Sequence, residues 1–181
     1  STLISQKEIL RMTHLKSPSS ILAVAEIPKP SLINKKSTTV LYLDNIKDPG
    51  NMGTIIRTLD WFGHSQLFCS TDSVDNYNSK VIMASMGSSF RVSVHYLNFD
   101  SLITTFPNHN TFGTFIEGEN LYEKNMNSNS IIVMGNESNG ISHNVNKKIK
   151  NKISIPSVGQ VESLNLSTAT AIVLSEIYRC C

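Results

Sequence analysis

Three short polar segments contain the residue types that could do chemistry in this sequence. They are Asn51-x-Gly53-x-x-x-Arg57, the run Gly135-Asn136-Glu137-Ser138-Asn139-Gly140, and Ile155-Pro156 followed by Glu162-Ser163-Leu164-Asn165-Leu166-Ser167. Backbone N–H and C=O groups beside glycines can read the polar edge of a ligand, and a guanidinium can grip a phosphate with a bidentate fork. Each segment follows a predicted strand, where open α/β sheets bind ligands. The three segments are therefore candidate parts of one site.

The first segment also has a purely structural interpretation. Asn51 is a plausible N-cap of a helix that ends at Gly63. On that helix Arg57 could pair with Asp60, three residues on, or stack over Trp61, four residues on. Taken alone, the segment predicts a capped, solvated helix as readily as a site.

The other polar segments have structural interpretations as well. The glycines of the second can supply positive φ at a strand-to-helix turn that Asn136 or Ser138 caps. In the third, Ser163 or Asn165 can be the N-cap of the last helix. The run Lys147-Lys148-x-Lys150-x-Lys152 is typical of a solvated helix end, which the helix dipole favours.

Several common chemistries have no support in the sequence. Gly135 and Gly140 have the first spacing of a phosphate loop, but Ile141-Ser142 follows where Lys-Ser/Thr is needed. No GxGxxG, HExxH or GxSxG motif occurs. The three cysteines have no metal-ligand spacing, and their odd number does not fit a disulfide framework. We expect no metal site and a reducing, cytoplasmic location.

Strands and helices alternate through most of the chain. A chain of 181 residues suits one domain of ordinary size. Continuous apolar runs suit strands buried on both faces, so the alternation predicts a mostly parallel α/β sheet. The predicted strands are Thr39–Leu43, Gln66–Cys69, Arg91–Tyr96, Thr111–Ile116 and Ile131–Met134, and the predicted helices after the first are 51–62, Lys80–Met86 and Ser167–Arg179. Asp48-Pro49-Gly50 is predicted as a turn and Asn120–Ser130 as an exposed loop.

The first 37 residues differ from the rest in charge. They contain six Lys or Arg and two Glu, whereas the whole chain carries a formal charge of only +2. Residues 1–16 are predicted to form an amphipathic helix and Ile21–Ala25 a strand between linkers. No apolar run approaches the roughly 18 residues that cross a bilayer, so we expect a soluble protein without a membrane partner.

Together, in this order and spacing, the three polar segments resemble the motifs of a known family. DNIKDPGNMGTIIRTLDWFG, IIVMGNESNGIS and ISIPSVGQVESLNLSTATAIVLSEIYR are similar to motifs one, two and three of the SpoU (TrmH-like) RNA ribose 2′-O-methyltransferases. SMGSSFRV, residues 85–92, is similar to the segment that connects them. The resemblance covers about residues 38–180. It departs at Leu59-Asp60, where the family has a small pair, and we expect this to alter packing and not activity.

The resemblance implies an α/β knot, a parallel sheet with a deep C-terminal trefoil knot that forms the pocket for S-adenosylmethionine. Carried over by motif, the cofactor would contact Thr114, Gly135, Asn136, Ile155 and Leu164. Ile155 and Leu164 are the apolar residue types that an adenine slot needs. No metal is implied.

The resemblance also implies the reaction, which is attack of an RNA ribose 2′-hydroxyl on the sulfonium methyl group. The family assigns activation of this hydroxyl to the arginine of motif one, Arg57 here. A guanidinium is not normally deprotonated, so we expect Arg57 to grip the RNA phosphate and polarise the hydroxyl. Asn51, Ser163 and Asn165 would position Arg57 and the ribose, and Glu137 would order the second-motif loop. The family's active site is completed across a homodimer.

Alternatives remain open within this resemblance. The chain could be a non-catalytic RNA-binding or ribosome-assembly paralogue, although its intact motif residues argue against such decay. Methylation of a base is less consistent with the Ser-Leu-Asn turn and the motif-one arginine. The substrate could be ribosomal or transfer RNA. We expect residues 1–37 to be the linker and remnant of an N-terminal RNA-binding domain, and residues 38–181 to be the catalytic domain.

Overall fold

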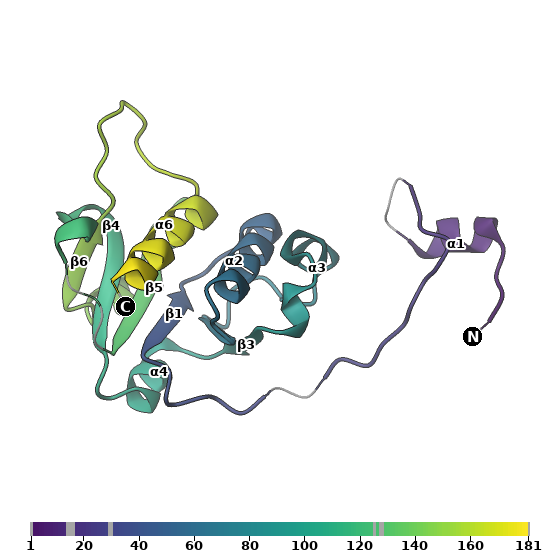
Figure 1. The fold of residues 1–181 in the computed structure, drawn as a ribbon, viewed down its shortest axis with the longest axis horizontal. Coiled ribbons are helices and arrows are strands. Elements are labelled where there is room, and N and C mark those ends of the chain that lie inside the picture. Colours follow the sequence, from purple (N-terminus) through teal and green to yellow (C-terminus); the bar gives the residue numbers. More distant parts are fainter. Residues whose placement is uncertain (1, 14–16, 29–30, 125, 127–128, 181) are drawn as a thin grey trace.

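The computed structural model describes residues 2–13, 17–28, 31–124, 126 and 129–180. Six strands form one parallel sheet in the order β3-β2-β1-β5-β4-β6 (Figure 1). The strands are β1 (Thr39–Leu43), β2 (Gln66–Cys69), β3 (Ser93–Tyr96), β4 (Asn110–Asn120), β5 (Ser130–Met134) and β6 (Asn151–Ser154). The α-helices are α1 (Gln6–Met12), α2 (Pro49–Trp61), α3 (Ser79–Ser85), α4 (Phe99–Thr105), α5 (His143–Asn146) and α6 (Leu166–Arg179), and the 3-10 turns are η1 (Ser88–Phe90) and η2 (Leu121–Glu123).

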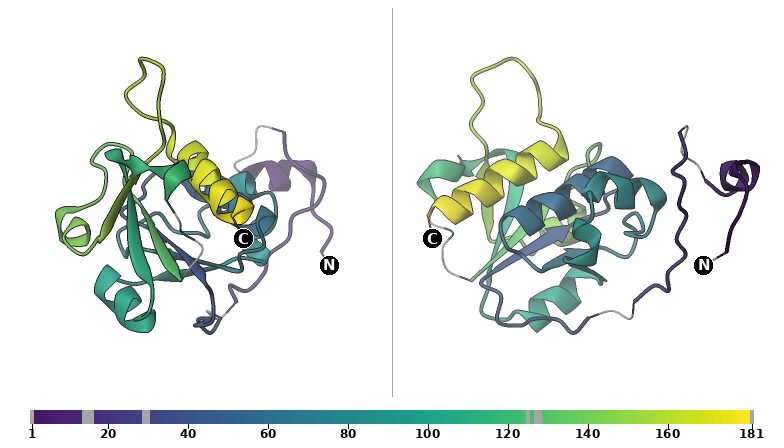
Figure 2. Two further views of the ribbon diagram at one scale, coloured as in Figure 1. Left: turned by 60° about the vertical axis from the view of Figure 1, so that its left-hand side comes forward. Right: turned by 45° about the vertical axis from the view of Figure 1, so that its right-hand side comes forward.

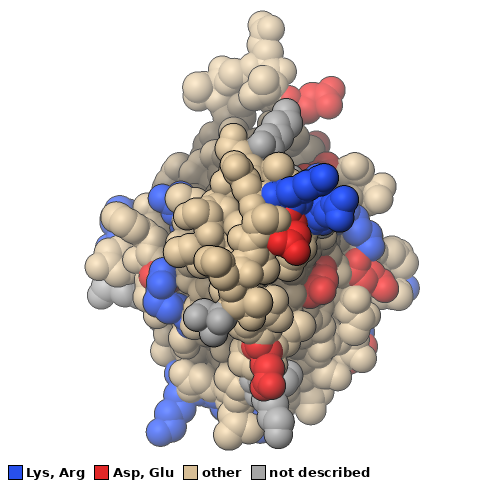
Figure 3. Space-filling model, turned by 90° about the vertical axis from the view of Figure 1, so that its right-hand side faces the viewer, with Lys and Arg blue, Asp and Glu red and all other residues tan. Residues whose placement is uncertain are grey.

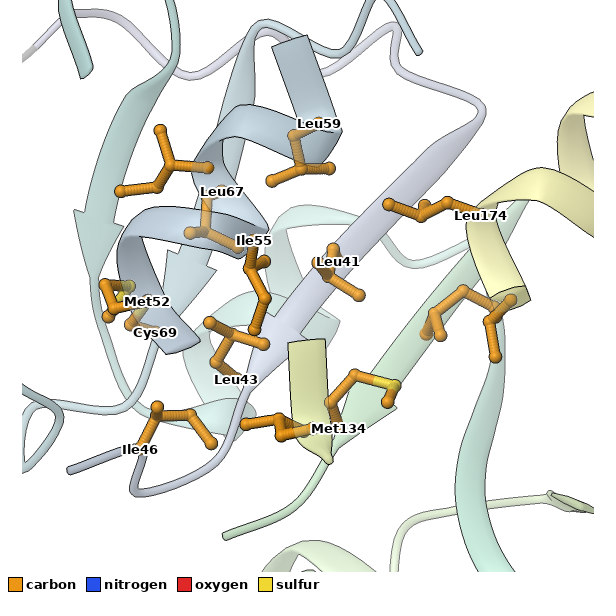
Figure 4. Close-up of a cluster of buried hydrophobic side chains, with 14 of the residues drawn as sticks. Leu41, Leu43, Ile46, Met52, Ile55, Leu59, Leu67, Cys69, Met134 and Leu174 are labelled. Atoms are coloured by element: carbon orange, nitrogen blue, oxygen red, sulfur yellow. The ribbon is translucent and has the colours of Figure 1, made fainter. Parts of the chain in front are cut away.

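Alternate residues of the central strands enter two hydrophobic clusters. On β1, Leu41 and Leu43 belong to the cluster beneath α2, α3 and α6, whereas Val40 and Tyr42 face the cluster beneath α4 and α5. Both faces of β1 and β5 are buried, which explains their unbroken apolar sequences. Figure 4 shows Leu41 between α2 and Leu174 of α6, and α2 and α6 lie side by side (Figure 2).

The parallel α/β architecture is therefore confirmed. The strands Thr39–Leu43 and Gln66–Cys69 have the predicted bounds, and the last helix begins one residue before the predicted start. Gly63 follows α2 with a positive φ of 77°, as a helix-terminating glycine requires. Strand order and contacts do not define how the chain is threaded, so the trefoil knot stays a prediction.

The start of α2 differs from the prediction. Asp48 is the N-cap, its Oδ1 accepts a hydrogen bond from the Asn51 N–H at 2.7 Å, and Pro49 occupies the first helical position. Proline is preorganised for that position and a carboxylate before it is a good cap, so the helix starts two residues before Asn51. The turn predicted at 48–50 is wrong, as is Asn51 as N-cap.

Other elements also depart from the sequence predictions. Ile21–Ala25 is not a strand, because no neighbouring strand pairs with it and its residues are exposed. The first helix is confined to Gln6–Met12, and residues 1 and 14–16 of the predicted helix lie outside the described residues. The predicted 120–130 loop contains η2 and the buried side chains of Leu121 and Met126. The short elements α4, α5 and β6 were not predicted as such.

The N-terminal segment extends away from the sheet and its helices (Figure 1). Contact with the body begins near Asn34, whose backbone N–H and C=O both bond to the buried side-chain amide of Gln66 at 3.0 and 2.9 Å. Seen from the side of this segment, Lys/Arg and Asp/Glu are interspersed over the surface (Figure 3). No helix in the described part of the chain is both long and apolar enough to span a membrane.

Gly53, a member of the first polar segment, allows α2 to contact α3 closely. A Cβ at this position would lie 2.6 Å from the Val81 carbonyl oxygen and 2.6 Å from the Ala84 Cβ. Such distances are shorter than van der Waals contact, so a side chain would force the two helices apart. The glycine of this motif therefore has a packing role.

We expect acid to destabilise the fold through His95. This ring is 9% exposed, stacks on Phe68 at 5.2 Å, and burial lowers its pKa, as it does for His64. Well above about pH 6.5 both histidines are neutral in the folded and unfolded chain. As the pH falls below that value the unfolded chain binds protons more readily, so the free energy of unfolding decreases.

The H95F variant should lose part of this pH dependence. Urea unfolding between about pH 6.5 and 5 measures how steeply the free energy of unfolding depends on pH. This pH window lies above the range in which ordinary carboxylates titrate. A variant with the full wild-type slope would exclude His95 as a source.

Candidate functional site

The three polar segments meet at the carboxyl edge of the sheet. The first follows β1 and continues into α2, the second follows β5, and the third connects β6 to α6. Because β1 and β5 are neighbours, with Leu43 opposite Met134, their following loops lie side by side. A cleft of about 730 Å³ opens there, lined by Asn45, Lys47, Asp48, Pro49, Asn51, Asn136, Glu137, Ser138, Asn139 and Asn165.

A chain of side-chain hydrogen bonds connects one residue from each segment. Asn165 Nδ2 donates to Asn51 Oδ1 at 3.0 Å, and Asn51 Nδ2 donates to Glu137 Oε1 at 2.8 Å. These pairs are 114 and 86 residues apart in the sequence. Asn51 is only 8% exposed, so an unpaired amide there would be costly.

The cap of α6 sets the direction of this chain. Asn165 Oδ1 accepts hydrogen bonds from the backbone N–H groups of Ser167 and Thr168, at 2.9 and 3.3 Å, and from the Ser167 hydroxyl at 2.7 Å. Its Nδ2 must therefore point to Asn51, whose own Nδ2 then faces Glu137. The predicted cap at Asn165 is confirmed, and the capping residue belongs to the cleft at the same time.

The loop after β5 is closed by its own backbone. Asn136 and Gly140 exchange two N–H···O=C bonds of 2.9 Å. The Asn136 side chain accepts from the N–H groups of Ser138 and Asn139 and donates to the Asn45 carbonyl at 2.7 Å. A Cβ at Gly135 would lie 2.3 Å from the Gly140 carbonyl carbon, and Gly140 has φ +65°. Both glycines are thus required by the backbone, which presents Glu137 at the loop surface.

Sequence reasoning missed the residues that hold the loop after β1. Ser70 Oγ accepts from the Asn45 N–H at 2.7 Å, and Ser73 Oγ accepts from the Ile46 N–H at 3.2 Å. The Val74 N–H donates to the Ile46 carbonyl at 2.8 Å. Asn45 itself has a left-handed φ of 60°, a conformation that asparagine adopts more readily than most non-glycine residues. Two serines after a strand carry no sequence signal for this role.

Arg57 does not join the hydrogen-bonded chain. It lies six residues beyond Asn51 on α2, a rise of about 9 Å along the helix axis, and is exposed with no hydrogen bond or ion pair among the described residues. Pairing with Asp60 is wrong, because Asp60 accepts from Ser88 and forms a salt bridge with Arg91 that lowers the pKa of its carboxyl. Stacking over Trp61 is not found either, because the cation–π interaction of the described residues is that of Lys152 with Phe115, and Trp61 is 85% exposed.

The other residues predicted for the site lie either in or directly after the strands of the sheet or on the exposed loop before α6. Gly135 and Ile155 directly follow β5 and β6, whereas Thr114 lies within β4, one residue beyond its last pair with β5, Gly113 opposite Val133. The strand β4 lies between β5 and β6 in the sheet. Thr114 Oγ1 donates to the Val133 carbonyl at 3.2 Å, and Ile155 packs against the larger cluster. Ser163 and Leu164 lie instead on the 156–165 loop, whose residues are all exposed and which projects from the body (Figure 1). The described residues contain no group of three or more potential metal ligands among His, Cys, Asp and Glu.

We expect the double variant S70A/S73A to loosen the loop after β1. Each lost hydroxyl leaves one backbone N–H without its partner, which costs about 1 kcal/mol in stability of the loop. Amide hydrogen exchange at Asn45 and Ile46 should therefore become about fivefold faster. Native-state exchange followed by mass spectrometry measures this. S89A is the control, since it removes the hydroxyl that donates to Ser85 Oγ elsewhere, and exchange at 45–46 that matches this control would contradict the assigned role.

Comparison with known proteins gives consistent matches. A model of the SpoU rRNA Methylase family matches residues 38–175. The chain is 29% identical over 175 residues to the 23S rRNA (guanosine(2553)-2′-O)-methyltransferase RlmP of Bacillus subtilis, covering 95% of this chain and 70% of that protein. A solved TrmH-family structure from Porphyromonas gingivalis has a TM-score of 0.80 at 34% identity, covering 98% of this chain and 73% of that one.

A ligand-bound structure is also similar. The AdoMet-bound rRNA methyltransferase from Sinorhizobium meliloti has a TM-score of 0.72 and 30% identity to this chain. The match covers 78% of this chain and 56% of that protein, so the chain spans little more than half the length of that relative.

Proposed function

Because this chain belongs to the SpoU rRNA Methylase family, we propose that it is a methyltransferase that uses S-adenosylmethionine to methylate a ribose 2′-hydroxyl in RNA. One observation supports this most directly. Asn165, Asn51 and Glu137, one from each motif, form a single hydrogen-bonded chain along a cleft at the carboxyl edge of the sheet. A knotted paralogue without activity would have no need to keep all three.

The residues proposed for the cofactor fit it. Gly135 and Ile155 directly follow β5 and β6, and Thr114 lies on β4, the strand between them. Gly135 leaves its backbone groups uncovered by a side chain. Leu164 is 45% exposed on a loop that follows Ile155, so an adenine could take up apolar contacts with both. Asn136 holds the loop that carries these backbone groups. When bound, S-adenosylmethionine supplies an electrophilic methyl group.

Arg57 would act on the RNA and not on the cofactor. Its guanidinium has no partner among the described residues, which leaves all of its donors free for a phosphate. Its position beyond the cleft suits a group that grips the RNA backbone and polarises the ribose hydroxyl. Asn51, Ser163 and Asn165 would orient the ribose, while Glu137 orders the second-motif loop. The phosphate or a water would accept the proton.

As the family resemblance implies, a homodimer would complete the site. The apolar face of α6 that Ala169, Ile172, Val173 and Ile177 form packs against the chain's own core. The exposed aromatic side chains lie elsewhere, with Trp61 85% exposed at the end of α2 and Tyr178 66% exposed on α6. Tyr178 packs on Phe62, so these rings share one surface, which we propose as the dimer interface.

We also propose how the chain divides into two parts and which RNA it acts on. Residues 38–181 would form the catalytic domain, and residues 1–37 the linker and remnant of an RNA-binding domain. The substrate would be ribosomal or transfer RNA in the cytoplasm. Mapping ribose methylation in both RNA classes from cells lacking the gene would identify the nucleotide.

Cofactor binding tests the enzyme proposal. Titration calorimetry with S-adenosylmethionine should give saturable binding, and the L164D variant should weaken it at least about tenfold, because one buried leucine is worth roughly 1.5–3 kcal/mol. V158D is the matched control, as Val158 is exposed on the same loop and has no proposed contact. If the wild-type chain shows no binding, the non-catalytic RNA-binding alternative is favoured.

The R57K variant tests the role of the guanidinium fork. Lysine keeps the charge and loses the bidentate geometry, so kcat/KM for methyl transfer to RNA should fall about 10- to 100-fold, which corresponds to a charge-assisted hydrogen bond of roughly 1.5–3 kcal/mol. The affinity for S-adenosylmethionine should not change. R11K, on the exposed surface of α1, is the control. Near-normal turnover by R57K would refute the proposal that the Arg57 guanidinium grips a phosphate with two hydrogen bonds.

A further inference from the structure

Acidic and basic residues are separated between the two edges of the sheet. The loops at the carboxyl edge, around the cleft, carry Asp44, Asp48, Asp72 and Glu137. Lys47, which also lines the cleft, donates its Nζ to the Asp72 carbonyl. A polyanion such as RNA is repelled by this set of carboxylates. Affinity for RNA therefore needs a basic surface elsewhere.

The amino edge supplies such a surface. Lys35 and Lys36 precede β1, and Lys147 and Lys150 precede β6. All four are exposed and form no ion pair within the described chain. The segments that make up this edge, 33–39, 105–111, 129–130 and 147–151, contain no Asp or Glu.

Hydrogen bonds join these segments into one rim. His109, just before β4, contacts the Ser37 carbonyl through Nε2 at 2.8 Å. At the start of β4, Thr111 Oγ1 donates to the Lys148 carbonyl and accepts from the Lys150 N–H, both at 2.9 Å. The lysines before β1 and before β6 are thus fixed on either side of the start of β4.

Two further features distinguish the rim from scattered surface lysines. Lys148, in the middle of the run, forms a salt bridge with Asp100 of α4, so this carboxylate beside the rim is already paired. A hollow of about 180 Å³ lies beside Lys35 and Lys36, and its other lining residues are Ser37, Thr105, Phe106, Pro107, Asn108, His109 and Asn129. Such hydroxyl and amide donors bind phosphate oxygens.

We propose that this amino-edge rim, formed by Lys35, Lys36, Lys147 and Lys150, binds the sugar–phosphate backbone of the RNA substrate. The proposal rests on the proposed RNA methyltransferase function and adds where the RNA is held. A five-residue strand such as β1 rises about 17 Å, which is about five stacked nucleotides along one RNA strand. One RNA segment can therefore lie on the rim while a nucleotide several positions away enters the cleft.

Charge reversal tests the rim directly. Binding of a fluorescein-labelled RNA hairpin to the full chain is measured by fluorescence anisotropy over a range of about 25 to 200 mM NaCl. K150E should weaken binding about fivefold, and K147E/K150E about 20-fold, with the slope of log K against log salt reduced by about 0.7–0.9 for each phosphate that the protein no longer neutralises. K80E is the matched control, because Lys80 is exposed on α3 without an ion pair and its reversal changes net charge equally.

The outcomes separate this proposal from the proposed function. Loss of affinity in K150E but not in K80E supports the rim, even if the chain then fails to bind S-adenosylmethionine or to transfer a methyl group. Equal losses in K150E and K80E, or no hairpin binding by the wild-type chain at about 25 mM NaCl, would overturn it. The midpoint of urea unfolding should be the same in all three variants as in the wild-type chain, which excludes misfolding as the cause.

Discussion

The pairing of β1 with β5 is the constraint on which the candidate site depends. The two strands are in register from Thr39 opposite Ser130 to Leu43 opposite Met134, and both are buried on both faces. The ladder continues one step further, since the Asp44 N–H donates to the Met134 carbonyl and Asp44 Oδ2 accepts from the Ser142 N–H. A slip of one residue would exchange the two faces of the strand. It would also separate the two loops whose side chains meet across the cleft.

The order of elements was largely predictable, because apolar runs and helical spacing act over a few residues. Ile131–Met134 could hardly be anything but a buried strand. Two short elements were not predictable: α5 (HNVN) and β6 (NKIS) have four residues each and contain a single apolar residue, so neither shows an apolar run, whereas the equally short β2 (QLFC) does. The start of α2 differs from its prediction because Asn51 is a good capping residue type, although Asp48 followed by proline is a stronger signal.

The candidate site was predictable as a set of segments and not as a geometry. Asn51, Glu137 and Asn165 stand out by motif, but the hydrogen bonds between them join residues far apart in sequence and depend on strand order. Ser70 and Ser73 had no signal, since a serine after a strand usually caps or turns its own backbone. Arg57 is separated from Asn51 by six residues of one helix, and this spacing alone places it about 9 Å further along the axis.

Asn165 belongs to α6 and to the cleft at once, and this makes the two thermodynamically linked. Its side chain holds free N–H groups of the helix with one atom and Asn51 with the other. A ligand that orders the Asn51–Glu137 pair therefore also lowers the tendency of the first turn of α6 to fray.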